Sequence, residues 1–380
     1  MLDKKALIKK TLNYVKEYKY IGRYRAEKII YNMERSNGEN TYLTENLVPY
    51  INKSGVVLSF DDSFRVKHWY QYGKEIFGFY DVKATFNINA FHPFENNRMH
   101  TQEEIDMLLE LQSNGHEIVH HGYKHRNAFQ YSKNFGVNKW IEDDIIPLLD
   151  WMENQSHSKT GNKFKKPISF AFPGSAYDKK LTSAIIPQYF KATRGHLRDN
   201  NLATFGETGF IPSICIDQNY FFELKNIKKA IKIAKNAGKN LVLMCHSILP
   251  DECNWDDFGW GKDSEIAGKY RISPRVLKEI INEVKGNDME FYTLAEVSGA
   301  ATFIDRNLEK SIRDILSCQN EWVMIKDLVS LRELDLSNKG ISNLDGIQYF
   351  LELESIDLRG NNIEDYRLLE KLPKLKRILM

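Results

Sequence analysis

The chain has 380 residues, of which 42% are hydrophobic and 27% are charged. This composition is ordinary for a globular protein, and the length is typical of two domains rather than one. The 53 basic and 51 acidic residues leave a net charge of +2. A protein whose main partner is nucleic acid normally carries a strong basic excess, so we expect no nucleic-acid partner.

The N-terminal segment, residues 1–52, is predicted to be helical. Leu12 and Val15, and later Ile29 and Met33, recur at roughly helical spacing. The first ten residues are charged and lack the apolar stretch of a signal peptide. We expect this segment to pack against the domain that follows it.

From residue 53 onwards, short apolar or β-branched runs alternate with helical stretches. The expected strands are residues 55–60, 83–88, 116–119, 168–172, 241–245 and 289–294. The expected helices include residues 102–113, 140–152, 224–235 and 273–284. Such alternation predicts βαβ units and a mostly parallel sheet. Six or seven units over about 250 residues fit a (β/α) barrel at residues 53–300, with an open doubly wound sheet as the alternative.

The pattern changes again in residues 301–380. The run Leu-Arg-Glu-Leu-Asp-Leu-Ser at 331–337 recurs in similar form as Leu-Glu-Ser-Ile-Asp-Leu-Arg at 353–359 and begins again at 375, a step of 22 residues each time. This spacing predicts a leucine-rich repeat solenoid, with residues 308–316 and 325–328 as its helical cap. The module resembles the cap-plus-repeat start of internalin-type proteins, which implies a protein partner. The alternative is a stabilising appendage.

Four cysteines are scattered through the chain without a Cys-x-x-Cys pair: Cys215, Cys245, Cys253 and Cys318. This usage argues against a disulfide framework and favours a reducing compartment. No run of about 18 apolar residues is available to span a membrane. We therefore expect a cytoplasmic protein without membrane contact, or a secreted one if a leader segment precedes this sequence.

Polar clusters follow four of the expected strands. They contain the pair Asp61-Asp62, the run His120 to His125, the turn after Phe172, and His246. The carboxyl ends of parallel strands meet on one face, so we expect these clusters to lie together. Taken alone, the aspartate pair is compatible with a helix cap and His246 with a buried structural histidine.

His121 and His125 stand four residues apart, either on one face of a helical turn or at two points of a tight loop. Two histidines and one carboxylate leave a coordination position open for water, as in catalytic zinc sites. His120 precedes them in an extended run, so we expect its side chain to face away from that of His121.

Together these residues resemble the motifs of NodB-type polysaccharide deacetylases, carbohydrate esterase family 4. The resemblance covers residues 55–297 and rests on Leu-Ser-Phe-Asp-Asp at 58–62, Lys-Ala-Thr-Phe at 83–86, Gly-His-Glu-Ile at 115–118 with His121 and His125, Ala-Phe-Pro-Gly at 171–174, and Leu-Met-Cys-His at 243–246.

The resemblance implies a distorted (β/α) barrel and the removal of acetyl groups from N-acetylated amino sugars in a glycan. It implies that Asp62, His121 and His125 bind a divalent metal, zinc in the first place. It further implies that Asp61 is the general base and His246 the general acid.

Two positions depart from the family pattern. Ala171 stands where the third motif often has an arginine that holds the base aspartate. We expect Arg194, on the following strand, to supply that charge. The Asp-Trp pair of the fourth motif is not evident in residues 210–213, which contain no tryptophan.

Substrate-binding residues are expected in two loops. Pro173, Gly174 and Tyr177 lie in the turn after the third motif, where a glycine lets a backbone N–H approach an oxyanion. Trp255 and Trp260 lie in the polar loop 251–262 after His246, where they would form a lid or a sugar platform. The alternative is a small aromatic cluster folded into that loop.

The sequence therefore predicts a metal-dependent deacetylase. One alternative is a non-catalytic metal- or glycan-binding protein that keeps the barrel while the repeats bind a protein partner. Another is an interaction scaffold that binds no metal. The retained aspartate pair, the two spaced histidines and His246 favour the enzyme.

Overall fold

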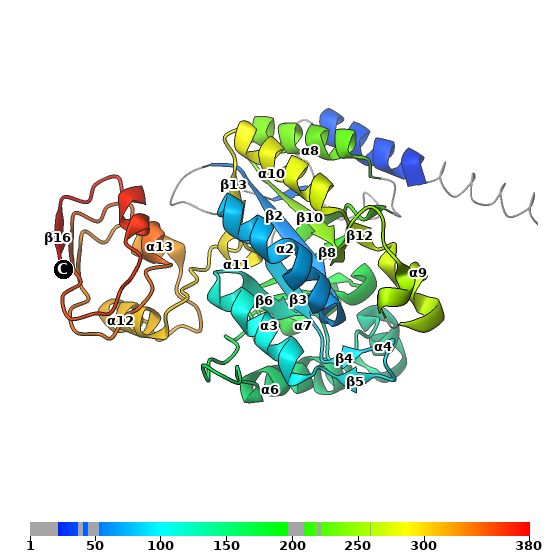
Figure 1. The fold of residues 1–380 in the computed structure, drawn as a ribbon, viewed down its shortest axis with the longest axis horizontal. Coiled ribbons are helices and arrows are strands. Elements are labelled where there is room, and N and C mark those ends of the chain that lie inside the picture. The colour runs from blue at the N-terminus through cyan, green and yellow to red at the C-terminus, as the bar shows by residue number, and fades with distance from the viewer. Residues whose placement is uncertain (1–21, 37–40, 45–52, 197–208, 219–221, 259) are drawn as a thin grey trace, which may run out of the picture.

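The structure is a computed structural model that describes residues 22–36, 41–44, 53–196, 209–218, 222–258 and 260–380 (Figure 1). A closed barrel forms the larger part, and a smaller C-terminal part stands beside it (Figure 1). Within the described residues, no helix combines the length and the apolar character needed to cross a bilayer.

Seven parallel strands form the barrel: β2 (Gly55–Asp61), β3 (Thr85–Ile88), β6 (Glu117–His120), β7 (Ser169–Ala171), β8 (Ala192–His196), β9 (Phe210–Cys215) and β10 (Asn240–Cys245). They follow one another around the ring in chain order, and β10 pairs in parallel with β2 to close it. The predicted (β/α) barrel is therefore confirmed.

Helices surround the ring: α2 (Val66–Tyr80), α3 (Gln102–Ser113), α4 (Ala128–Phe135), α5 (Val137–Trp140), α6 (Ile146–Asn154), α7 (Lys179–Ile185), α8 (Leu224–Ala237), α9 (Ser264–Gly268) and α10 (Pro274–Gly286). Their boundaries follow local sequence signals. A capping box of Thr101 and Glu104 begins α3. In α8, the residues Ile227, Ile231 and Ala234 recur at helical spacing and are buried against the sheet side.

Part of the predicted N-terminal helical segment lies outside the described residues. Residues 22–35 form a helix beside α8 (Figure 1), and Ala26, Ile30 and Met33 join the apolar core of the barrel. The short strand β1 (Leu43–Thr44), which pairs antiparallel with β10, was not predicted. The described part of this segment thus packs against the barrel as expected.

Two barrel strands, β8 and β9, were not among the expected strand ranges, although Arg194 was placed on a strand after residues 168–172. Strand β8 contains Arg194 and Gly195, and β9 contains Pro212, so neither reads as a continuous apolar run. The expected strand 289–294 does form, as β13 (Glu290–Tyr292), but it pairs with the beginning of β2 outside the closed ring.

The C-terminal part stacks three short parallel strands: β14 (Glu333–Asp335), β15 (Ser355–Asp357) and β16 (Arg377–Leu379). Glu333 lies opposite Ser355, and Ser355 lies opposite Arg377. The Asn361 side chain donates to the carbonyls of Leu336 and Leu358, both at 2.8 Å. The helices α12 (Arg306–Leu316) and α13 (Ile325–Leu328) precede the stack.

One apolar cluster joins the barrel floor to the C-terminal part. It contains Val57, Val242 and Leu294 from the floor and Phe303 and Leu334 from the C-terminal part. The short helix α11 (Leu294–Val297) connects the two. A polar bond reinforces this junction, because the Tyr349 hydroxyl donates to Glu296 at 2.8 Å. The predicted domain boundary at residue 300 therefore lies inside a shared core.

Glu117 is a buried carboxyl group at this floor, and we expect it to make stability depend on pH. It accepts hydrogen bonds from the Thr85 hydroxyl at 2.9 Å and the Ala295 amide at 3.1 Å. Burial raises its pKa to about 7, whereas the unfolded chain titrates it near 4.5. The folded state therefore holds an extra proton between these values, and its stability falls as pH rises through them.

The change Glu117→Gln should remove up to about 3 kcal/mol of this pH dependence between pH 4.5 and 7. Urea unfolding of both proteins across that range measures the difference in slope. An unchanged slope in the variant would contradict the assignment.

Candidate active site

Strand β2 ends in the two adjacent carboxylates. Asp61 is its last residue, and Asp62 leaves the strand with φ 72°, in the left-handed region. This turn breaks the alternation that would send the two side chains to opposite faces. Nε2 of His121 lies 3.8 Å from an Asp61 oxygen and 3.6 Å from an Asp62 oxygen. The helix-cap alternative is not met, because the Asp62 side chain makes no cap bond to the turn that follows.

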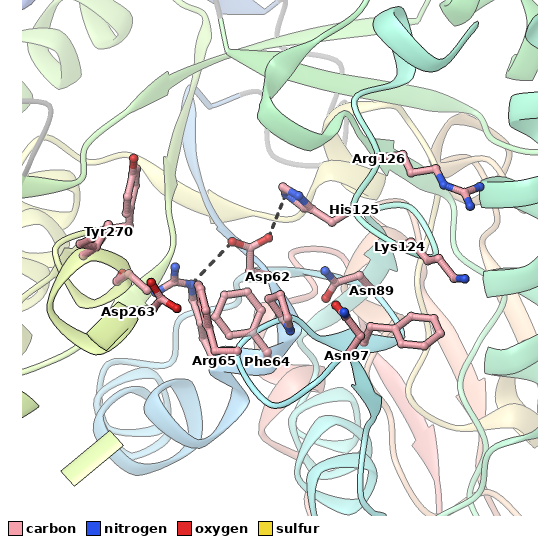
Figure 2. A pocket seen from close by; sticks show the side chains of 15 residues that line it. Asp62, Phe64, Arg65, Asn89, Asn97, Lys124, His125, Arg126, Asp263 and Tyr270 are labelled. Atoms are coloured by element: carbon pink, nitrogen blue, oxygen red, sulfur yellow. Dashed lines mark hydrogen bonds and ion pairs between the residues drawn. The ribbon is translucent and has the colours of Figure 1, made fainter. Parts of the chain in front are cut away.

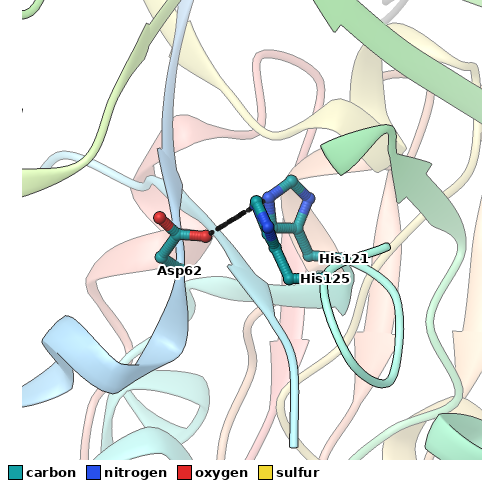
Figure 3. A group of neighbouring side chains, drawn as sticks. All are labelled: Asp62, His121 and His125. Atoms are coloured by element: carbon teal, nitrogen blue, oxygen red, sulfur yellow. Dashed lines mark ion pairs between the residues drawn. The ribbon is translucent and has the colours of Figure 1, made fainter. Parts of the chain in front are cut away.

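Asp62, His121 and His125 form a group whose candidate ligand atoms all lie within 4.8 Å of one another (Figure 3). His125 Nε2 lies 3.1 Å from Asp62 Oδ1. Two ligand atoms on a tetrahedral zinc ion lie roughly 3.3 Å apart, given bonds of about 2.0–2.1 Å. The spacing of the three side chains therefore fits a small divalent cation.

The unused atoms of this group also fit a cation. Asp62 Oδ1 is buried and, apart from its ion pair with His125, has no hydrogen-bond partner among the described residues. His121 Nδ1 lies 2.8 Å from the Ala171 carbonyl, and a carbonyl requires a donor. The proton of His121 is thus placed on Nδ1, which leaves the Nε2 lone pair facing Asp62.

The protonation of the group follows from burial and charge. Burial lowers the pKa of His121 to about 4, so this ring is neutral near pH 7, the form that ligates metals. Burial alone would raise the pKa of Asp62 and lower that of His125. Their mutual attraction outweighs burial, so the pKa of Asp62 lies well below its usual value and that of His125 lies above it.

Asp61 is held by a fully buried arginine. The Arg194 guanidinium donates to Asp61 Oδ1, and the Asn87 amide donates to the same oxygen at 2.9 Å. Arg194 on β8 lies in register with Ala171 on β7. It therefore occupies the place beside Asp61 that the sequence analysis expected it to fill, and Asp61 Oδ2 is left facing His121.

His246 follows β10 and pairs with an aspartate that the sequence analysis missed. Asp217 Oδ2 lies 2.6 Å from His246 Nδ1, and Asp217 Oδ1 accepts from the His246 amide at 3.1 Å. The thiol of Cys245 also donates to Asp217, at 2.9 Å. Burial would lower the pKa of His246, but the Asp217 carboxylate outweighs it and raises the pKa. His246 Nε2 faces Asp62 at 3.9 Å.

The position of Asp217 in the sequence could have indicated its role. It comes two residues after the end of β9 (Phe210–Cys215), where the other strands also carry their polar clusters. The same rule would have found it if β9 had been recognised as a strand.

A cavity of about 630 Å³ opens beside the metal-ligand group (Figure 2). Asp62 and His125 form part of its wall, and Arg65 lies between Asp62 and α9 (Figure 2). The other residues of the wall are Phe64, Asn89, Phe91, Pro93, Phe94, Asn97, Lys124, Arg126, Asp263, Ile266, Ala267 and Tyr270. This cavity is the place for a substrate next to the candidate metal ligands.

The residues predicted to bind substrate do not line this cavity. Pro173 is buried, and Gly174 lies at φ 57° with open space where a Cβ would project. The ring of Tyr177 packs on Phe172 and Phe210. The contact of these three residues with substrate stays a prediction.

The aromatic loop after His246 differs from the expected platform. Trp260 is only 6% exposed and packs in a cluster with Phe64 and Phe94. Trp255 is half-buried beneath the Arg271 guanidinium, whose carbon lies 4.9 Å from the ring centre. Trp260 is therefore too buried to form an exposed platform, and the loop folds its aromatic rings into a small cluster. Contact of Trp255 and Trp260 with substrate stays a prediction.

His120 faces away from the site, as the extended run predicted. Its side chain is fully buried between Phe170 and Phe190. Its Nε2 lies 3.0 Å from the Ile145 carbonyl, and its Nδ1 accepts from the Gly122 amide at 3.0 Å. His120 therefore supports the loop that carries the other two histidines.

One family model matches part of the chain. Residues 51–186 match the family model of polysaccharide deacetylases. This match supports, as the enzyme class, a hydrolase that acts on carbon–nitrogen bonds, a deacetylase. The matched region contains Asp61, Asp62, His121 and His125. No curated protein matches the chain significantly.

The chain is similar to several solved structures at low sequence identity. The peptidoglycan deacetylase PdaC from Bacillus subtilis is 16% identical over 70% of this chain and 98% of its own, with a TM-score of 0.36. The chitin deacetylase from the fungal pathogen Colletotrichum lindemuthianum is 13% identical over 64% and 88%, with a TM-score of 0.39. A CE4 family pseudoenzyme from Bacillus anthracis is 14% identical over 65% and 66%, with a TM-score of 0.40. At these TM-scores the likenesses carry no argument about activity.

The buried pair of Asp61 and Arg194 gives a stability prediction. Arg194→Met leaves the Asp61 charge buried without a counter-charge, which should lower the free energy of unfolding by about 3–5 kcal/mol. Adding Asp61→Asn to that variant should restore most of the loss, because the unpaired charge is gone. Urea unfolding of the two single variants and the double variant forms the cycle. A loss below about 1 kcal/mol in Arg194→Met would argue against the pairing.

Proposed function

We propose that this protein is a metal-dependent deacetylase that removes acetyl groups from N-acetylated sugars. The observation that carries the proposal is the arrangement of five side chains at the carboxyl ends of the barrel strands. Asp62, His121 and His125 offer a three-ligand set, while Asp61 and His246 face it from two sides. The deacetylase match of residues 51–186 gives this arrangement its chemical class.

We infer that the ion is a divalent metal and, from two histidine nitrogens and one carboxylate, that zinc is the first candidate. When bound, such an ion supplies Lewis acidity to an amide carbonyl and to water. The protein holds the ligands in place through the Ala171 carbonyl on His121 and through the turn at Asp62.

Asp61 is proposed as the general base. Arg194 and Asn87 hold one of its oxygens, so the other oxygen is directed at the His121 side of the site, where it can take a proton from the attacking water. Asp61 is not proposed as a metal ligand, because Arg194 already compensates its charge.

His246 is proposed as the general acid. Asp217 fixes the proton of Nδ1 and raises the pKa of the ring, so Nε2 carries a proton toward the site. An amine is a poor leaving group unless it is protonated as the carbon–nitrogen bond breaks, and His246 is placed to give that proton. The turn of Pro173, Gly174 and Tyr177 is proposed to offer a backbone N–H to the oxyanion.

We also infer that residues 301–380 form a leucine-rich repeat module with a helical cap. The 22-residue register of the stacked strands and the Asn361 bonds support this inference. Its shared core with the barrel floor supports a stabilising role. A protein partner that binds the repeats is a separate proposal. Pull-down with the wild type beside variants substituted at Glu333 and Arg377 on the repeat strands would test it.

Acetate release from N-acetylglucosamine oligomers tests the deacetylase. Zinc-loaded wild type should release acetate. Asp61→Asn should lower kcat by about 10²- to 10⁴-fold, as expected for loss of a general base, while it keeps one zinc per chain. His121→Ala should lose both zinc and activity, because it removes a ligand.

Asp150→Asn is the control, since it removes one negative charge from an exposed position on α6. It should behave like the wild type. Wild-type activity in both site variants would refute the assigned roles. Tight zinc binding with no release from any acetylated sugar or small amide would favour the non-catalytic binding protein instead.

A further inference from the structure

An irregular helical turn lies directly behind the loop of the two histidines. Helix α5 ends at Trp140, residues Ile141–Ile145 form a π-helical turn, and α6 begins at Ile146. Pro147 follows and has no N–H, so it cannot bond the Asp143 carbonyl as a regular α-helix would require. Turns of this kind leave backbone carbonyls available for partners outside the helix.

Three successive carbonyls of this turn bind the histidine loop. The Asp143 carbonyl accepts from the Arg126 side chain at 2.9 Å. The Asp144 carbonyl accepts from the Tyr123 amide at 3.0 Å. The Ile145 carbonyl lies 3.0 Å from His120 Nε2. The turn therefore contacts the loop before, within and after the pair of metal-ligand candidates.

The Asp144 side chain adds a fourth contact. It is fully buried, and its Oδ1 accepts from the Lys124 amide at 3.0 Å. Its Oδ2 is buried without a hydrogen-bond partner among the described residues. That oxygen lies 2.6 Å from the place where a Cβ on Gly122 would be, and Gly122 itself has φ 78°. A residue with a Cβ at position 122 would therefore clash with the Asp144 carboxylate.

The residue that depends most on this support is His125. Its backbone lies at φ 52°, which is unfavourable for a residue with a side chain. The two amides that Asp144 binds belong to Tyr123 and Lys124, immediately before it. His125 is also the least buried of the three ligand candidates, with 41% of its side chain exposed. Its direction toward Asp62 is thus set by the loop backbone rather than by packing around the ring.

We propose that Asp144, presented by the π-helical turn, is a positioning residue for the metal loop and sets the aim of His125 at Asp62. This inference rests on the metal centre of the proposed function. It assigns to Asp144 no contact with substrate. Its effect is on metal affinity, because a ligand that is not held in place must be ordered when the ion binds.

Zinc titration of metal-free protein by isothermal calorimetry tests this role directly. Asp144→Ala should weaken zinc binding about 10- to 100-fold, the range seen when a residue that orients a metal ligand is lost. Asp144→Asn keeps an oxygen for the Lys124 amide and should lose less. Urea unfolding of each variant reports separately on stability.

Asp143→Asn is the matched control. It removes the same charge one residue away, where the carboxylate accepts hydrogen bonds, among the described residues, from the Tyr131 hydroxyl at 2.7 Å and the Lys139 ammonium at 2.8 Å. Its carbonyl bond to Arg126 is unaffected by the change. The zinc Kd of Asp143→Asn should equal that of the wild type.

Gly122→Ala provides a second route if Asp144→Ala does not fold. The added Cβ pushes against Asp144 Oδ2 and should weaken zinc binding, and this loss should be smaller when Asp144 is already alanine. The inference is overturned if folded Asp144→Ala and Gly122→Ala both bind zinc with the wild-type Kd. Absence of zinc binding by the wild type itself would instead overturn the proposed metal centre.

Discussion

The site depends on the closure of the barrel by the parallel pairing of β10 with β2. Five residue pairs in register, from Leu241 with Val56 to Cys245 with Phe60, join the last barrel strand to the first. Because every barrel strand runs in the same direction, the carboxyl ends form one rim. Closure brings His246, at the end of β10, next to Asp62, at the end of β2, although the two are far apart in the chain.

At this rim the buried charges are arranged in pairs. Asp61 is compensated by Arg194, and Asp217 by His246. Asp62 is shared among weaker contacts, with one oxygen 3.1 Å from His125 and the other 3.6 Å from Arg65. A buried carboxylate without a dedicated counter-charge is the natural place for a cation. The opposite end of the barrel packs against the C-terminal stack, and the two share one apolar core.

Much of this could be predicted from the sequence because the signals were local. The alternation of apolar runs with helical stretches predicted the barrel, and the polar residues after those runs predicted Asp61, Asp62, His121, His125 and His246 as neighbours. Arg194 was predicted only through the missing charge at Ala171. The structure places it in register with that alanine, at Asp61.

The parts that could not be predicted depend on contacts between distant segments. Strand β9 contains Pro212 and lacks a strong apolar pattern, so Asp217 was overlooked with it. The aromatic loop was assigned to the surface because its neighbours are polar, yet Trp260 has enough apolar partners in Phe64 and Phe94 to be buried. The π-helical turn left no periodic signal, since an extra residue in a helix changes the hydrogen bonds more than the composition.

The central claim is that Asp62, His121 and His125 form one metal centre, and anomalous diffraction at the zinc edge tests it most directly. Crystals of the protein grown with zinc should show one strong peak about 2.0–2.2 Å from Asp62 Oδ1, His121 Nε2 and His125 Nε2. A peak at another position, or no peak at this rim with zinc in excess, would contradict the account.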